Sequence, residues 1–152
     1  MPLKLTAPIY TTSELTKSDE KYGKSEDKDP TWVTVKQASQ GEHEQRQALF
    51  ATLEQKWSQL DPDEVSLVQT VSMEEVKKLE VYLTLCESNF LDEADKPLFP
   101  TRQKDGNPQL AMPKAQFVKA WARLLPDVAR EIHEIVLEAN PLWGSRPAGE
   151  AL

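Results

Sequence analysis

The segment from Phe117 to Trp143 constrains the fold most, because its apolar residues repeat at helical spacing on both sides of a proline. One helical face is marked at i, i+4, i+7 and i+8 by Phe117, Trp121, Leu124 and Leu125. Pro126 suits the first position of a second helix, where its missing N–H costs nothing. The spacing then returns in Val128, Ile132, Ile135, Val136 and Ala139. Asn140-Pro141 ends this helix, and the pair holds no evident catalytic group, so it is predicted to pack and bind.

Length and charge narrow the classes of function. The chain has 152 residues, enough for one domain with a hydrophobic core. Its formal net charge of -7 and its pI of about 4.9 argue against binding nucleic-acid phosphate through bulk electrostatics. No apolar run approaches the roughly 18 residues expected of a membrane span, and the N-terminus lacks the apolar core of a secretion signal. A single cysteine fits a reducing compartment, so we expect a cytoplasmic protein.

The N-terminal third predicts a disordered segment followed by a strand and a helix. Residues 1–29 are predicted to be a flexible charged arm, because they offer few apolar side chains to offset the entropy of ordering them. Thr31 to Gln37 is rich in β-branched and aromatic residues, which is typical of a strand. Ser39 and Glu42 then match a capping box, which predicts the start of a helix.

The middle of the chain is predicted to repeat this passage from strand to helix. Glu64 to Val71 alternates in part between apolar and polar residues and is a second strand candidate. Ser72 and Glu75 form a second capping box, so a helix is expected to follow directly. One face of that helix is expected to carry Val76, Leu79, Leu83 and Cys86.

Residues 91–112 are predicted to form a long irregular connection, because they hold three prolines and a glycine. A loop of this length in a small domain is usually functional or mobile. Asp105-Gly106 predicts the tip of a hairpin. Very short strands are expected on either side of it, at residues 97–99 and 109–111.

These elements predict an α+β fold that is mostly helical, with about four to five helices and a small sheet. Order is expected over a single domain at residues 30–143. The flexible N-terminal arm precedes this domain, and a frayed tail at residues 144–152 follows it.

The residues that could support catalysis or metal binding do not complete a known pattern. His43 and His133 are each followed by glutamate, as in the zinc protease motif HExxH, but Gln47 and Leu137 stand where the second histidine is needed. We interpret both histidines as polar helix-surface residues. Cys86 is expected to be a buried, inert thiol. The sequence also lacks a glycine-rich phosphate loop and the EF-hand spacing, so we expect no enzymatic activity, no cofactor and no metal.

Aromatic and apolar residues outside the helical faces are the candidates for contact with a partner. Trp57 and Trp121 lie on apolar helical faces and are expected in the core. Tryptophan is enriched among the residues that dominate binding energy at protein interfaces, so the other two tryptophans are candidates. With two residues of the long connection, the predicted partner-binding set is Trp32, Leu98, Phe99 and Trp143.

Three segments of the chain resemble the tail assembly chaperones of long-tailed bacteriophages. They are DPTWVTVKQASQGEHEQR (Asp29 to Arg46), VSMEEVKKLEVYLTLCESNF (Val71 to Phe90) and FVKAWARLLPDVAREIHEIVLEANPLW (Phe117 to Trp143). Proteins of that family often have a short strand element followed by helices, and a helical end with a Leu-Pro break and a closing Asn. The resemblance spans about residues 29–143 and lies in this pattern and in a few short strings.

The resemblance implies a protein without catalytic residues that assists tail assembly in the host cytoplasm. Its implied partner is the phage tape measure protein, the tail tube protein or both, with no direct contact to nucleic acid or membrane. Self-association is left open.

Two functions from other classes also fit the sequence. One is a structural virion component, such as a head-to-tail connector or a tail completion protein. The other is an acidic inhibitor that mimics nucleic acid, for which the last helix would present a charged stripe of Glu131, Glu134 and Glu138. A solvated helix face is the commoner explanation of such a stripe.

Overall fold

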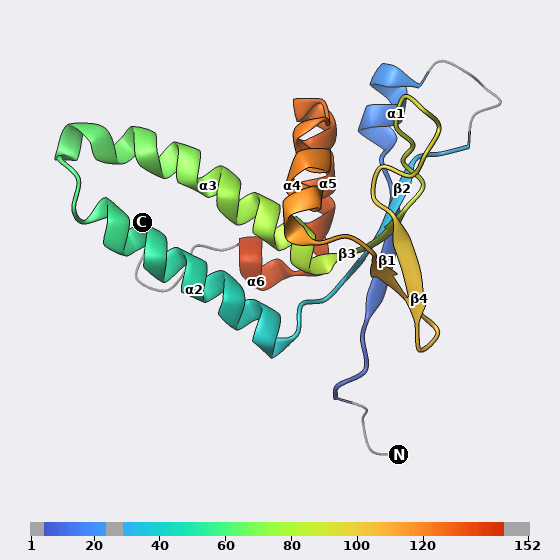
Figure 1. The fold of residues 1–152 in the computed structure, drawn as a ribbon, viewed down its shortest axis with the longest axis horizontal. Coiled ribbons are helices and arrows are strands. Elements are labelled where there is room, and N and C mark those ends of the chain that lie inside the picture. Colours follow the sequence, from blue (N-terminus) through green and yellow to red (C-terminus); the bar gives the residue numbers. More distant parts are fainter. Residues whose placement is uncertain (1–4, 24–28, 145–152) are drawn as a thin grey trace.

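The predicted strand at Thr31–Gln37 is confirmed as β2 (Trp32–Lys36), and it is the central strand of the main sheet (Figure 1). The structure, a computed structural model, describes residues 5–23 and 29–144. β2 pairs antiparallel with β1 (Tyr10–Glu14) on one side and with β3 (Leu85–Ser88) on the other. Its alternate residues Val33 and Val35 are fully buried, because successive side chains of a strand point to opposite faces and this face meets the core.

The N-terminal segment is a part of this fold, so the prediction of a flexible arm is wrong for residues 5–23. β1 pairs with β2 along its whole length, and α1 (Thr16–Tyr22) follows it directly. Leu15, between them, is fully buried in the core. The low average hydrophobicity of this segment led to the wrong prediction. The segment is ordered by the burial of a single leucine, Leu15, and by the pairing of β1 with β2, and average hydrophobicity reports neither. Residues 1–4 and 24–28 of the predicted arm lie outside the described residues.

The capping box at Ser39 is confirmed and starts α2 (Gln40–Trp57), but the second strand candidate is wrong. Glu64–Val71 is helical and belongs to α3 (Pro62–Thr84), which begins with Pro62 at its first turn. Ser72 is therefore not a cap. It lies buried within α3 and accepts a hydrogen bond from the Trp57 indole at 3.3 Å. The helix ends at Thr84, so Cys86 lies in β3 and not on the predicted helical face.

The hairpin tip predicted at Asp105-Gly106 is confirmed. It joins β4 (Thr101–Lys104) to β5 (Asn107–Leu110), which pair antiparallel in a second sheet. Both tip residues have positive φ, 53° and 81°, as a type I′ turn requires. The two strands lie a few residues from the predicted positions 97–99 and 109–111.

The second of the long C-terminal helices begins at Pro126 and ends before Asn140, as predicted. α4 (Lys114–Ala122) and α5 (Pro126–Ala139) are separated by the break before Pro126, and α6 (Pro141–Gly144) is a single short turn. Asn140, between α5 and α6, fixes their junction to the sheet. Its side-chain oxygen accepts from the Ala38 N–H at 2.7 Å, and its amide nitrogen donates to the Lys36 carbonyl at 3.2 Å. The predicted frayed tail lies outside the described residues from position 145 onward.

The predicted α+β class is confirmed, with six helices and two small antiparallel sheets within the described ranges. The additional helices relative to the expected four to five are the short α1 and α6. No helix in these ranges is both long and apolar enough to cross a lipid bilayer.

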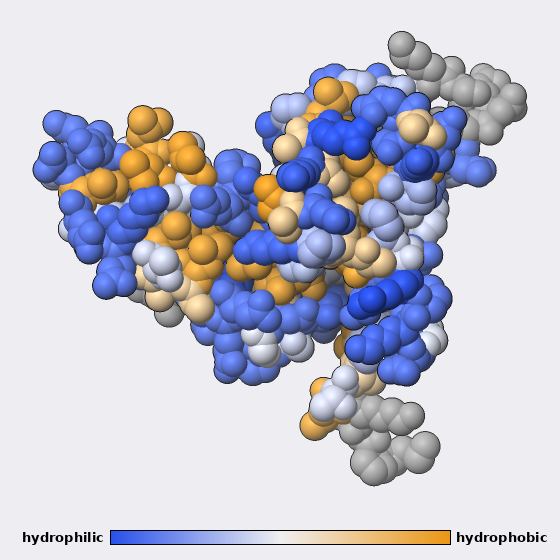
Figure 2. All heavy atoms as spheres, viewed as in Figure 1, coloured by the Kyte–Doolittle hydropathy of each residue, from blue (hydrophilic) through white to orange (hydrophobic). Residues whose placement is uncertain are grey.

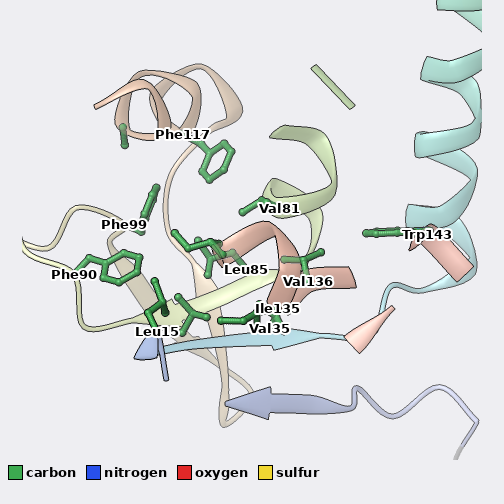
Figure 3. Close-up of a cluster of buried hydrophobic side chains, with 13 residues drawn as sticks. Leu15, Val35, Val81, Leu85, Phe90, Phe99, Phe117, Ile135, Val136 and Trp143 are labelled. Atoms are coloured by element: carbon green, nitrogen blue, oxygen red, sulfur yellow. The ribbon is translucent and has the colours of Figure 1, made fainter. Parts of the chain in front are cut away.

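Two separate hydrophobic clusters hold the fold together. The body cluster gathers the sheet, α4, α5 and the end of α3, and Figure 3 shows its phenylalanine rings converging from three segments. Its buried members are Leu15, Val33, Val35, Val81, Leu85, Phe90, Phe99, Phe117, Ala120, Ile132, Ile135, Val136 and Trp143. Trp121, which was expected in the core, is partly buried and packs against this cluster. The hairpin cluster lies between α2 and α3, with buried Phe50, Leu53, Trp57 and Val76.

Candidate partner-binding surface

The α2–α3 hairpin projects from the rest of the molecule (Figure 1), and its outer half is held together by the hairpin cluster and by the hydrogen bond from Trp57 to Ser72. α3 has 23 residues, which corresponds to a helix about 34 Å long. Its last turns reach the body cluster through Val81, whereas its first half extends beyond the body. The hairpin therefore presents a helix face that the rest of the described chain does not cover.

Two large apolar side chains are exposed on that face. Leu67 is 70% exposed and Val71 is 61% exposed. They are four residues apart, so they lie on the same side of α3. Val68 and Met73 pack against the hairpin cluster, so α3 uses one face for α2 and leaves another open. Figure 2 shows apolar atoms gathered at this outer end of the hairpin. Single exposed apolar residues are common, but these two lie together on one face of a projecting helix and form a small apolar patch.

A buried network of charged groups attaches the base of the hairpin to the body. Arg46 of α2 donates from Nε to Glu80 of α3 at 2.6 Å, and His133 of α5 places Nε2 at 2.7 Å from the other Glu80 oxygen. The side chains of Arg46 and Glu80 are only 6% and 4% exposed. The Arg46 guanidinium also donates to the Trp143 carbonyl at 3.3 Å. The charges satisfy one another, which lets them be buried.

The sequence patterns did not predict this network, although they held a sign of it. Arg46 precedes Phe50 and Leu53 at i+4 and i+7, so it shares the buried face of α2. Glu80 stands in the same way between Val76 and Leu83 on α3. A charged residue on an otherwise apolar face indicates a partner of opposite charge on a neighbouring helix, but not which one.

The two histidines are not the surface residues that we predicted. His133 is 13% exposed and contacts Glu80, and His43 accepts a hydrogen bond from the Trp143 indole at 3.1 Å. They are used as hydrogen-bonding groups at the base of the hairpin. In the described part of the chain, no three His, Cys, Asp or Glu side chains gather closely enough to hold a metal ion.

The four residues predicted to bind a partner are not brought together. Trp143 and Phe99 are buried, at 5% and 1% exposure, so a partner could reach them only if the chain rearranged. Figure 3 shows Trp143 beside α2 and apart from the phenylalanine rings. Leu98 and Trp32 are partly buried. Leu98 lines an apolar groove of about 300 Å³ beneath α1, together with Leu91 and Leu124. A partner contact at Leu98 or Trp32 stays a prediction.

The acidic side of α5 binds α1 and is not an open stripe. Glu131 is 7% exposed and accepts from the backbone N–H groups of Lys17 and Ser18 at 3.0 and 2.8 Å. These are two of the N–H groups that the first turn of a helix leaves unpaired, so Glu131 caps α1 from a distant part of the chain. The hydrogen bond from Lys21 and then that from Tyr22 hold the pKa of Asp127 below its ordinary value of 3.8.

The capping role of Glu131 predicts a local effect on α1. Glu131→Ala should lower the free energy of unfolding by roughly 1–3 kcal/mol, because it leaves buried donors unpaired. Hydrogen exchange should show faster exchange at the amides of Lys17 and Ser18 than in wild type. Glu138→Ala, an exposed change on the same helix, is the control and should leave both amides protected. Unchanged protection in the Glu131 variant would contradict the assignment.

Cys86 is buried as expected and is 4% exposed. Burial raises the pKa of its thiol to about 11, although Lys36 acts in the opposite direction. The thiol donates a hydrogen bond to the Thr84 carbonyl at 3.3 Å. It lines a groove of about 380 Å³ beside Tyr10 and Lys104, but it faces this space as a neutral thiol at physiological pH.

The raised pKa predicts that Cys86 is unreactive in the folded protein. Ellman's reagent at pH 8 should react slowly with the native chain and fully in denaturant, because only the thiolate is a good nucleophile. The measurement is clean since the chain has one cysteine. Rapid, complete reaction of the native protein would contradict the prediction.

Comparisons with protein-family models, with curated proteins and with solved structures found no match to this chain.

Proposed function

We propose that the chain is a non-enzymatic tail assembly chaperone of a long-tailed bacteriophage. It binds the tape measure protein in the host cytoplasm during tail assembly and is then released. The observation that carries the proposal is the exposed apolar face of α3 at the outer end of the projecting hairpin. An assembly factor needs such a face, because it must hold its client by reversible contacts.

The chemistry of the polar groups supports a binding role. At the base of the hairpin, Glu80 is buried and hydrogen-bonded to Arg46 through one oxygen and to His133 through the other. These contacts fix the hairpin to the body and leave its outer half for contact with a partner. The resemblance of three segments to tail assembly chaperones supplies the class of client, and the hairpin supplies the surface.

The structure gives no support to the nucleic-acid mimic. Of the three glutamates in its proposed stripe, Glu131 is buried and Glu134 pairs with Lys17 at 3.2 Å. Glu138 is exposed, and among the described residues no ion pair is formed with it. The stripe is therefore largely occupied by α1.

Co-purification with the tape measure protein tests the proposal. Tagged wild type should retain the co-expressed tape measure protein, and Leu67→Ser with Val71→Ser should lose most of it. Ile9→Ser is the matched control, because Ile9 is 55% exposed and lies in a different part of the molecule. Circular dichroism should be unchanged in both variants, since neither alters the core. If wild type retains no tape measure protein and is found in purified particles, the chain is a structural virion component.

A further inference from the structure

The exposed apolar pair on α3 is bracketed by acidic side chains on the same helical face. Asp63 and Glu64 precede Leu67 by four and three residues, and Glu74 and Glu75 follow it by seven and eight. These spacings place all of them along one side of the helix. All four carboxylates are exposed, and the face from the first to the last is about 18 Å long.

Few positive charges offset these carboxylates. Residues 54–75 contain six acidic side chains and one basic side chain. Lys77 pairs with Glu74 at 3.2 Å, in an exposed contact that water screens. Within the described residues, no basic side chain forms an ion pair with Asp63, Glu64 or Glu75. The face therefore combines an apolar centre with negative ends.

From this arrangement we propose that the outer face of α3 binds an amphipathic helix whose apolar side chains are flanked by lysine or arginine. The apolar side chains would contact Leu67 and Val71, and the basic ones would meet the acidic pairs on either side. The inference rests on the proposed function in that the helix belongs to the client protein. The face runs for about 18 Å along one helix, which suits a helix packed along it better than a strand.

A second copy of the chain is a poor occupant of the same face. In a two-fold contact centred on Leu67 and Val71 with antiparallel helices, each acidic pair would lie opposite the acidic pair of the other copy. Like charges placed together in this way oppose association. The same negative charge opposes nucleic acid and anionic lipid.

Designed peptides test the chemistry of this face. The probes are two helical peptides of about 18 residues, long enough to form helix in water with alanine-rich sequence. Both carry the same leucine spacing, one with flanking lysines and the other with flanking glutamates. Fluorescence anisotropy with the full chain should show binding of the lysine peptide, with at least about tenfold weaker binding of the glutamate peptide. Added salt should weaken the first complex.

Charge reversal locates the effect on α3. A variant with lysine at Asp63, Glu64, Glu74 and Glu75 should lose the lysine peptide and gain the glutamate peptide. The control variant has the same net charge, with lysine placed at four exposed acids elsewhere, Glu14, Glu20, Glu44 and Glu138. It should keep the wild-type preference. Equal affinity for both peptides, or the same loss in the control variant, overturns the inference.

The results separate this inference from the proposed function. If tape measure protein is retained through Leu67 and Val71 but charge reversal on α3 has no effect on peptide binding, the proposed function stands. The inference that the face binds a helix with basic flanks is then wrong. If the peptides show the expected preference but tape measure protein is not retained, the inference about the chemistry of this face stands. The proposed chaperone function is then wrong. Self-association in sedimentation, abolished by serine at Leu67 and Val71, would identify a second copy as the occupant and overturn the inference.

Discussion

Glu80→Ala is expected to lower the free energy of unfolding by roughly 3–5 kcal/mol. Glu80 is 3% exposed, and both of its oxygens are used, one by Arg46 and the other by His133. Removing it leaves the Arg46 guanidinium buried without its counter-charge, which is the costly part of breaking a buried pair. Urea denaturation followed by circular dichroism gives the loss directly.

A double variant separates the cost of an orphaned charge from the value of the ion pair. Arg46→Met with Glu80→Leu removes both charges and keeps apolar volume, so its loss should be much smaller than the sum of the two single losses. Glu74→Ala is the matched control on α3, because its pair with Lys77 is exposed and should matter little. A loss below about 1 kcal/mol for Glu80→Ala would mean that water reaches the pair in solution.

Phe117→Ala is expected to cost roughly 3–5 kcal/mol, the range for a large aromatic side chain removed from a core. Phe117 is fully buried, and its ring lies 5.3 Å from that of Tyr82 and 5.7 Å from that of Phe99, between centroids. The cavity would open where α3, α4 and the 91–100 segment meet. Thermal and urea unfolding should both show the loss.

Trp121→Ala serves as the comparison for Phe117→Ala. Trp121 stacks on Phe117 at 5.9 Å but is only partly buried, so its loss should be smaller. Equal losses would mean that the partly exposed Trp121 side chain contributes as much to the free energy of unfolding as the buried Phe117 ring. A loss near zero for Phe117 would mean that the neighbouring rings collapse into the space without strain.

The parts of the fold that the sequence predicted correctly have local causes. The capping box at Ser39, the break at Pro126 and the turn at Asp105-Gly106 each depend on residues a few positions apart. The misassigned first half of α3 shows the limit of periodicity. Leu67 and Val71 fit both an alternating and a helical spacing, and Pro62 at the first turn decides for the helix.

The missed features depend on contacts between distant residues. Glu131 caps α1 across 113 positions in the sequence, and Arg46 meets Glu80 across 34. Nothing in either local sequence specifies these partners, so α1 was predicted to be disordered. Burial likewise depends on distant contacts: of the predicted partner-binding residues Trp32, Leu98, Phe99 and Trp143, the fold buries Phe99 and Trp143 and leaves the other two partly buried.

Because the two hydrophobic clusters are separate, the outer half of the hairpin is joined to the body only through its base, where the Arg46–Glu80 ion pair lies beside the body-cluster residues Val81 and Trp143. Leu67 lies 13 residues before Glu80, a distance of roughly 20 Å along the helix. A tilt of the hairpin by about 10° about its base would move Leu67 by roughly 3 Å, while the residues at the base would shift far less. A load on the outer end would therefore be borne at the base, by the contacts of Glu80 with Arg46 and His133 together with the packing of Val81 and Trp143 in the body cluster, and the rigidity of this base limits how far the hairpin can tilt.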